Sequence, residues 1–459
     1  MGDQIVRVFA DPPHLLKNIR NALVNYDFEL PDSIVKKYNL PSNLVKMDHI
    51  KQLYEYELRR EDKLAPRLSK DCVFVKGFNK MNVNFARNAL SRDVAAALRS
   101  LVTLEKFPQE VLTTAFFCER IGKWYDLATA RAPHLGFSLS KPEKLDSALD
   151  FLDEMMYIMD TTMFYAHQKL GRPDIVRGFL LSTTSLKELV NSCLSGKGYK
   201  FVLSGRFTSD CIENYFSQVR RKNLAPTPLE FIKALRVLTF LQTMKPSQHG
   251  SYEEDEEAVW LTELRDVKQM EAERAAEAEE DAEEDEDDIV IAEWIAERDL
   301  SQHLAQVYVM GCVLAKTICK RRGSFCKTCM DIFTQPEGTE DLHAFIKEKE
   351  WCPGSLVYPS PTAMKIFTMM YDNFMEYRDR IQQDKKIIQK IIDTLYLTIR
   401  EKYPEIPHCH LDVILNRWFD FRMFFLAKYL NSYHIARISK RLKGSANGSK
   451  SMAGHYVDM

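Results

Sequence analysis

Hydrophobic positions recur at the spacing of an α-helix over much of the first two hundred residues. One such stripe comprises Leu90, Val94, Ala97, Leu98 and Leu101. Ser91 is a suitable N-cap for this first helix. A second helix is predicted over residues 116–128, before Pro133. A third is predicted over residues 147–170, and its methionine stripe (Met155, Met156 and Met159) is expected in the core. The pattern therefore predicts a mostly helical segment over residues 26–190.

Two short apolar runs interrupt this pattern, and each is followed by an acidic residue. Residues 5–10 predict a strand that ends at Asp11, after which a helix leaves at once. Residues 201–203 predict a second strand, followed by a loop and a helix that carries Glu213. Carboxylates placed in this way can bridge two Mg²⁺ ions about 4 Å apart for phosphodiester cleavage. Taken alone, the segment around Asp11 favours a helix N-cap, and Glu213 favours a surface helix carboxylate.

The sequence around both carboxylates resembles P-element-type DNA transposases, a THAP-domain family, over residues 5 to about 240. The family segment Asp-x-Pro-His-Leu-Leu-Lys-x-x-Arg-Asn carries its second catalytic Asp and matches residues 11–21. Its segment Gln-Asp-x-Leu-Glu-Asn-x-Phe carries the catalytic Glu and matches residues 209–216, with Ser209 replacing Gln and Ile212 replacing Leu. The resemblance implies a mixed α/β and α fold. A helical insertion domain would interrupt a partial RNase H-like core, and a mainly helical C-terminal region would follow.

The same resemblance implies Mg²⁺-dependent DNA cleavage and strand transfer, with Asp11 and Glu213 as catalytic metal ligands. The first catalytic Asp of the family lies upstream of the matched segments and has no counterpart in this sequence. We therefore expect a transposase that is weak or inactive as written. The alternative is a non-enzymatic protein that binds DNA or transposase and acts as an adaptor or repressor.

The helical insertion resembles the part of these transposases that binds GTP. The matching sequence includes Lys80-Met81-Asn82-Val83, Leu90-Ser91 and Trp124-Tyr125-Asp126. The resemblance implies that Asp126 accepts hydrogen bonds from guanine, that Asp210 is a second polar contact, and that Asn82, Val83 and Ser91 surround the nucleotide. Asn82 stands where Lys is common and Thr129 where Asn is frequent. The alternative is a helical packing domain that binds no nucleotide.

Basic residues flank both predicted carboxylate segments, although the formal net charge is only -2. The candidates for phosphate contacts are Lys17, Arg20, Arg206, Arg220, Arg221 and Lys222. Such contacts give affinity for DNA but no sequence specificity. The alternative is an ordinary solvated face.

The ten cysteines form no dense disulfide framework, so we expect reduced thiols. Cys326-x-x-Cys329 has the spacing of half a zinc site, and either Cys352 or the cluster His408-Cys409-His410 is a candidate second half. Four protein ligands would make the Zn²⁺ structural. The alternative is a set of reduced thiols beside a buried histidine.

Together these features predict six segments along the chain. They are residues 1–25 (N-terminal remnant of the RNase H-like core), 26–190 (GTP-binding-type insertion), 191–245 (C-terminal part of the core), 246–288 (acidic linker), 289–440 (helical C-terminal region) and 441–459 (disordered tail). Neither a signal peptide nor an apolar run long enough to span a bilayer is evident. We expect a nuclear protein whose partners are DNA and, as an oligomer, itself or a full-length transposase, with no membrane partner.

Overall fold

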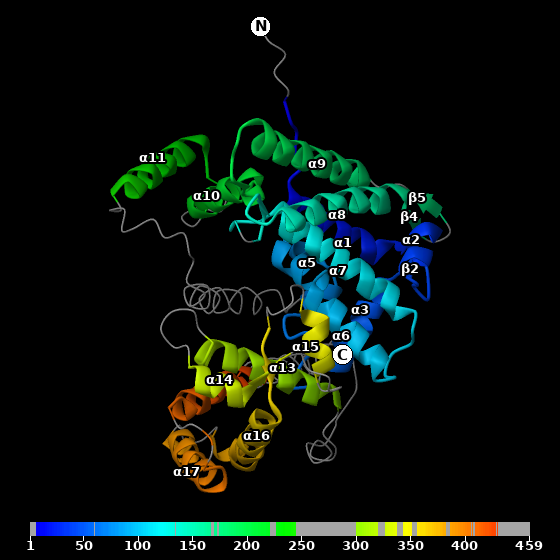
Figure 1. Ribbon diagram of the computed structural model, residues 1–459. Coiled ribbons are helices and arrows are strands. Elements are labelled where there is room, and N and C mark those ends of the chain that lie inside the picture. The colour runs from blue at the N-terminus through cyan, green and yellow to red at the C-terminus, as the bar shows by residue number, and fades with distance from the viewer. Residues whose placement is uncertain are drawn as a thin grey trace, which may run out of the picture. The chain divides into compact units, whose positions relative to one another are not determined.

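The computed structural model describes residues 6–220, 226–244 and 300–429, apart from short gaps within these ranges (Figure 1). The gaps are residues 59, 134, 167–168, 172–173, 320–325, 337–342, 351–355, 382–385, 405, 407–408 and 428. The predicted acidic linker and C-terminal tail lie outside the described residues. The chain divides into two compact units, Met1–Thr208 with Arg298–Phe425, and Ser209–Glu297 with Leu426–Met459. Each unit is described by itself.

The larger unit is mainly helical, as the hydrophobic spacing predicts. Its N-terminal helices are α1 (Pro12–Asn25), α2 (Asp32–Lys37), α3 (Met47–Glu57), α4 (Lys70–Val73), α5 (Val83–Ala89), α6 (Arg92–Thr103), α7 (Val111–Ala128), α8 (Pro142–Thr161) and α9 (Asp174–Asn191). Shorter helical turns are η1 (Gly77–Met81), η2 (Ser192–Gly196) and η3 (Ser204–Phe207). Ser91 caps α6 by accepting a hydrogen bond from the Val94 N–H, which confirms the predicted cap. The prediction that the methionine stripe lies in the core is confirmed for Met155 and Met159, which are buried, whereas Met156 is half-buried.

Helix α7 is central to the packing of this unit. It packs along α6 and also contacts α1 and α8 (Figure 1). Its Trp124 ring lies 4.3 Å from the ring of Phe179 on α9, measured between centroids. The Trp124 indole N–H donates to the Thr183 hydroxyl at 3.0 Å. A large aromatic side chain is thus buried with its one polar group satisfied.

A small antiparallel sheet lies among these helices, in the order β2-β1-β4-β5. Its strands are β1 (Asp27–Glu29), β2 (Leu44–Val45), β4 (Met163–Ala166) and β5 (Lys169–Gly171). In the central strand, Phe28 is opposite Val45 on one side and Phe164 on the other, and it is fully buried. Strands of two to four residues carry too few positions for a period of two to be recognised in a sequence.

The predicted helix over residues 147–170 is correct only as far as Thr161. Thr162 has extended backbone angles, and the aromatic run that follows forms β4 against β1. Aromatic residues pack well on a pleated surface, which here prevails over the helical spacing. The predicted strand over residues 201–203 is confirmed as β6 (Phe201–Val202), which pairs with β3 (Phe137–Ser138).

The predicted strand before Asp11 is wrong over its described part, residues 6–10. Among the described residues no strand pairs with this segment, and side chains of α9 bind its backbone instead. The Ser182 hydroxyl donates to the carbonyl of Ala10 at 2.6 Å, and the Ser185 hydroxyl to that of Val8 at 2.7 Å. The apolar run therefore lies along a helix, where hydroxyls replace the hydrogen bonds of a sheet.

The C-terminal part of this unit is formed by α13 (Leu300–Thr317), α14 (Lys327–Phe333), α15 (Ala344–Lys349), α16 (Pro361–Ile381), α17 (Lys386–Lys402) and residues 411–425 of a last helix. The short strands β7 (Thr334–Gln335) and β8 (Tyr358–Pro359) pair with each other. Helix α15 packs against α6, where Arg99 forms an ion pair with Glu348 at 3.2 Å. No described helix combines the length and the apolar character that crossing a bilayer requires.

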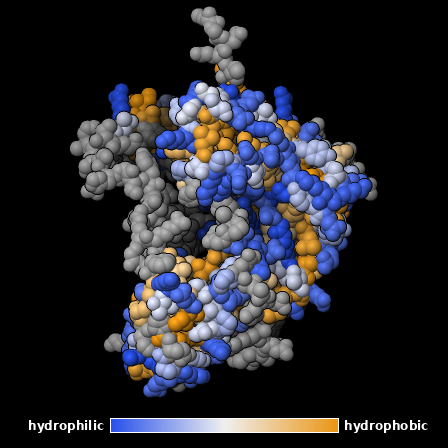
Figure 2. Space-filling model, viewed as in Figure 1, coloured by the Kyte–Doolittle hydropathy of each residue, from blue (hydrophilic) through white to orange (hydrophobic). Residues whose placement is uncertain are grey.

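The described part of the smaller unit consists mainly of α10 (Asp210–Arg220) and α11 (Pro228–Met244), which contact each other. The rings of Phe216 and Phe231 stack between them at 5.8 Å. Thr227 and Glu230 form a reciprocal cap at the start of α11, which begins at the predicted proline. On the face shown in Figure 2, hydrophobic side chains occur in small groups between larger hydrophilic areas.

Candidate functional site

Asp11 is the N-cap of α1. Its Oδ2 atom accepts from the backbone N–H of His14 at 3.2 Å and lies 2.6 Å from Nδ1 of the same residue. Pro12 and Pro13 follow at the first helical positions, where a missing N–H costs nothing. The cap role that the local sequence allows is therefore present. A metal role for Asp11 stays a prediction.

Lys17 and Arg20 were predicted to contact phosphate, but both side chains are buried. Arg20 Nη2 donates to the carbonyl of Asn79 at 2.7 Å and to Oδ1 of Asn21 at 3.1 Å. Asn21 Nδ2 in turn donates to the carbonyl of Lys80 at 3.2 Å. Burial lowers the pKa of Arg20. These placements argue against a DNA contact and show instead that α1 holds the backbone of η1.

The segment held in this way leads directly into three of the predicted nucleotide residues. Asn82 is the N-cap of α5, accepting from the backbone N–H groups of Asn84 and Phe85, and Val83 is its first residue. Ser91 is the cap of α6. All three residues thus lie at helix N-termini, where the helix dipole favours an anion and the side chains of Asn82 and Ser91 already accept from backbone N–H groups.

Helix α7 approaches the start of α6 at Gly122. A Cβ atom at Gly122 would lie 3.2 Å from the carbonyl oxygen of Leu90, so only glycine allows this close approach without a shift. Asp126 lies one turn further along α7, on the same face. Its carboxylate is 53% exposed and lies 3.8 Å from Nη2 of Arg87 on α5. Desolvation raises the pKa of Asp126, and the charges of Arg87 and Arg92 oppose this effect.

Arg87 and Arg92 were not identified from the sequence as possible nucleotide contacts. Arg87 forms the ion pair with Asp126, and Arg92 is the first residue of α6. Neither lies in a cluster of basic residues, so composition gave no signal. A regular helix places Arg87 one turn after Val83, on the same face, and that spacing could have revealed it.

Glu213 and Asp210 belong to the smaller unit and lie in the first turn of α10. Oε1 of Glu213 accepts from the Ser209 hydroxyl at 3.2 Å. Asp11 and Asp126 belong to the larger unit, so the predicted carboxylate pair is divided between separately described parts of the chain. Arg206 is exposed on η3, and Arg220 ends α10. Arg221 and Lys222 lie outside the described residues.

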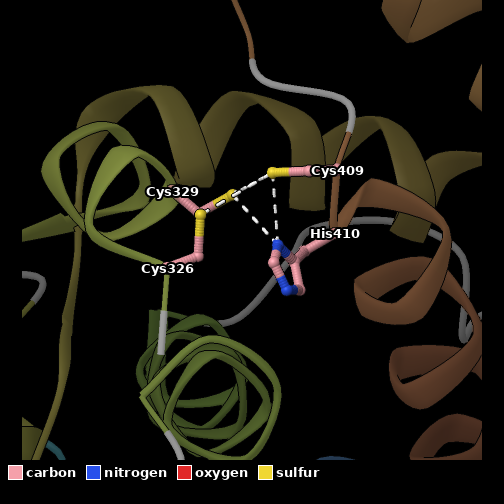
Figure 3. Close-up of side chains that lie close together, drawn as sticks. All are labelled: Cys326, Cys329, Cys409 and His410. Carbon is pink, nitrogen blue, oxygen red and sulfur yellow. Dashed lines mark hydrogen bonds between the residues drawn. The ribbon is translucent and has the colours of Figure 1, made fainter. Parts of the chain in front are cut away.

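The predicted half zinc site lies at the N-terminus of α14, where Cys326 is the N-cap and Cys329 follows three residues later. Figure 3 shows that Cys409 and His410 point toward the same place from the segment before the last helix. The ligand atoms of all four residues lie within 4.8 Å of one another. Hydrogen bonding from the backbone N–H of Cys329 lowers the pKa of the Cys326 thiol. Cys352 and His408, the other candidates, lie outside the described residues.

Comparisons with known proteins match one family model, two curated proteins and one solved structure to parts of this chain. Residues 13–141 match the family described as TNP-like, GTP-binding insertion domain. This range contains Asn82, Val83, Ser91 and Asp126. It ends before the C-terminal helices and the cysteine cluster.

Two curated relatives are transposases. The chain is 23% identical over 235 residues to the Transposable element P transposase of Drosophila melanogaster, covering 50% of this chain and 30% of that protein. It is 25% identical over 249 residues to the human (Homo sapiens) DNA transposase THAP9, covering 51% of this chain and 26% of that protein. The chain thus matches less than a third of the length of either relative.

A solved structure, the Drosophila P element transposase strand transfer complex, is similar with a TM-score of 0.44 and 22% identity, over 52% of each chain. The RNase H-like core stays a prediction. The family match and the two curated relatives confirm that this chain resembles P-element-type transposases.

Proposed function

We propose that this chain is part of a P-element-type DNA transposase and that its insertion binds GTP. The observation that carries the proposal is that α7 contacts two other helices within the matched residues. Gly122 of α7 packs against the start of α6, and Asp126 of α7 forms an ion pair with Arg87 of α5. Arg92, the first residue of α6, supplies a cation for a phosphate, and Arg87 pairs with Asp126. Asp126 supplies the carboxylate for the base.

Guanine recognition follows from the pattern of donors on the base. Guanine presents its N1–H and its exocyclic amino group side by side, and one carboxylate accepts from both. Asp126 is exposed enough to receive them, since about half of its side chain is accessible. Desolvation raises the pKa of this carboxylate, and the charge of Arg87 opposes that effect. Adenine lacks this pair of donors, so GTP is the preferred nucleotide.

The test is a nucleotide competition against a fluorescent GTP analogue, using the full chain. Asp126→Asn should weaken GTP by at least about tenfold, because a charge-assisted pair of hydrogen bonds is lost. The same variant should gain affinity for xanthosine triphosphate, whose 2-oxo group accepts from the new amide. Asp146→Asn, an exposed carboxylate on α8, is the matched control and should change neither affinity. Unchanged GTP and xanthosine triphosphate affinities in Asp126→Asn would contradict the assignment.

For the transposase chemistry, the proposal assigns Asp11 and Glu213 as Mg²⁺ ligands in DNA cleavage. The informative variants keep the local hydrogen bonds of each residue while reducing its affinity for a metal. Asn caps a helix about as well as Asp, so Asp11→Asn should preserve the start of α1. Glu213→Gln can still accept from the Ser209 hydroxyl. Any metal-dependent nicking of DNA by the wild-type chain, which is expected to be weak, should be lost in both variants, and GTP affinity should stay intact.

A second candidate function is a non-enzymatic adaptor in the nucleus that binds DNA or a transposase. The observation that favours it is the use of Asp11 as a cap, a role that needs no metal. The nicking assay separates the two functions. Binding of DNA or of a transposase subunit without nicking in Mg²⁺ or Mn²⁺ supports the adaptor, and nicking lost in both variants supports the enzyme.

A further inference from the structure

We propose that Cys326, Cys329, Cys409 and His410 bind one structural Zn²⁺ ion that joins α14 to the last helix. Cys326 and Cys329 of α14 are the pair whose spacing in the sequence predicts half a zinc site. The other two ligands come from a segment about eighty positions later in the chain, and they are the pair that the fold brings to the same point (Figure 3). The site lies entirely within the larger unit.

The distances agree with those of a tetrahedral zinc site. Zn–S bonds of 2.3 Å and tetrahedral angles place two sulfurs about 3.7 Å apart. The Sγ atoms of Cys326 and Cys409 are 3.7 Å apart, and those of Cys329 and Cys409 are 3.2 Å apart. Nδ1 of His410 lies 3.5 Å from Sγ of Cys329 and 3.2 Å from Sγ of Cys409. A small central ion can therefore contact all four atoms with little movement.

The ligand chemistry selects zinc among the common biological metals. Three thiolates and one imidazole form a soft donor set, which suits Zn²⁺ and excludes Mg²⁺ and Ca²⁺. The set contains four protein ligands, so no position is left for a substrate or an activated water. Three thiolates close together repel one another, and a divalent cation removes most of that repulsion. The ion would thus stabilise the fold and take no part in cleavage.

The surroundings show which parts of the chain the ion would hold together. Cys329 is fully buried, whereas Cys409 is exposed, so the site lies at the edge of the core. Cys326 and Cys329 occupy the first turn of α14, which packs against α16. His410 directly precedes the last helix, and Leu411 at its start is buried. The ion would therefore fix the beginning of this helix, and its loss should loosen the C-terminal helices first.

The metal content of the full chain tests the proposal. Protein purified from zinc-supplemented medium under reducing conditions should contain one Zn²⁺ per chain by elemental mass spectrometry. Cys329→Ser, Cys409→Ser and His410→Asn should each reduce this content severalfold. His408→Asn and Cys352→Ser are matched controls, because both are candidates from the sequence alone, and both should keep one ion. Cys193→Ser, a half-buried cysteine outside the cluster, should also keep it.

A second measurement does not depend on how well the variants fold. Cobalt(II) exchanged into the wild-type chain should give the visible spectrum of a tetrahedral ion and the near-ultraviolet absorption of thiolate ligands. Removal of the metal ion by a chelator should then make the thiols of Cys326, Cys329 and Cys409 reactive toward a thiol reagent in the native protein. A wild-type chain without bound zinc, or with a Cys329–Cys409 disulfide after purification under reducing conditions, would overturn the proposal. Loss of zinc from His408→Asn with retention in His410→Asn would overturn the ligand assignment. None of these results depends on GTP binding or nicking.

Discussion

Arg422 on the last helix and Glu61 in the loop after α3 form an ion pair across 361 positions of sequence, with Arg422 Nη2 lying 2.8 Å from Glu61 Oε1. The same guanidinium also binds Asp62, and Arg378 binds the other oxygen of Glu61 at 3.0 Å. Arg422 is only 3% exposed. The C-terminal helices are thus connected by buried charge to the segment that resembles the GTP-binding insertion.

Replacing Arg422 with Met should lower the free energy of unfolding by roughly 3 to 5 kcal/mol, because two buried carboxylates lose their main partner. Urea denaturation followed by circular dichroism gives the value. Arg400→Met, at an exposed position of α17, is the control and should cost less than about 0.5 kcal/mol. Adding Glu61→Gln and Asp62→Asn to Arg422→Met should recover part of the loss. No recovery would show that packing, rather than charge, is responsible.

Glu57 should make the stability of the fold depend on pH. Its buried carboxyl accepts from the backbone N–H groups of Leu64 and Ala65, yet burial raises its pKa from 4.5 to about 7. The folded state therefore holds a proton that the unfolded state releases above about pH 4.5. The resulting stability is complete below that pH, falls as the pH rises to about 7, and is constant above it.

The expected loss between pH 4.5 and 7 is on the order of 3 kcal/mol. Unfolding free energies of the wild type and Glu57→Gln, measured at pH 5 and pH 8, isolate this contribution. Gln carries no titrating proton, so the variant should lose less stability over the interval. Equal changes in both proteins would mean that the Glu57 carboxylate is ionised in the folded state.

Gly311→Ala should destabilise the packing of α13 by about 1 to 3 kcal/mol. A Cβ atom at this position would overlap the backbone carbonyl oxygen of Val357, which cannot move as a side chain can. Thermal unfolding of the two proteins measures the effect. Gly196→Ala is the control, since a Cβ there meets nothing within 4 Å. A similar loss of stability in both variants would show that the overlap with Val357 is not its cause.

The burial of Lys17 makes a prediction about DNA affinity. Each phosphate contact changes the slope of log affinity against log salt by about 0.9 for duplex DNA. Lys17→Met should leave this slope unchanged, because the side chain is enclosed by protein. Arg206→Met, which removes an exposed charge, should reduce the slope by about one contact if η3 faces DNA. Titration of labelled DNA at several salt concentrations gives both slopes. A lower slope for Lys17→Met would restore the phosphate contact predicted from the sequence.

Local sequence signals predicted features whose cause is local. The cap at Ser91, the buried Met155 and the helix carrying Glu213 all follow from the side chains of a few neighbouring residues. Asp11 illustrates the limit of such signals, because one carboxylate fits a cap and a metal ligand equally well. The structure shows the cap, which needs only the next three residues.

Features that depend on distant residues were not predictable in this way. Residues 6–10 have the composition of a strand, but the nearest partners for their carbonyl groups are Ser182 and Ser185 on α9. Arg20 lies one turn from Lys17, which suggests an exposed basic face. The Arg20 guanidinium is buried instead and donates to the carbonyl of Asn79, 59 positions later in the chain. The approach of Cys409 and His410 to Cys326 and Cys329 likewise depends on residues about eighty positions apart in the chain.

The pairing of β1 with β4 brings Asp27 opposite Tyr165, so the chain enters and leaves the intervening helices at neighbouring points. Paired strands hold their Cα atoms about 5 Å apart, whatever the length of chain between them. The strand pair therefore fixes the distance between the two ends of the intervening segment, independently of the number of residues in that segment. The helix that follows Asp11 thus has a second fixed point beside it, at the place where the chain returns from these helices.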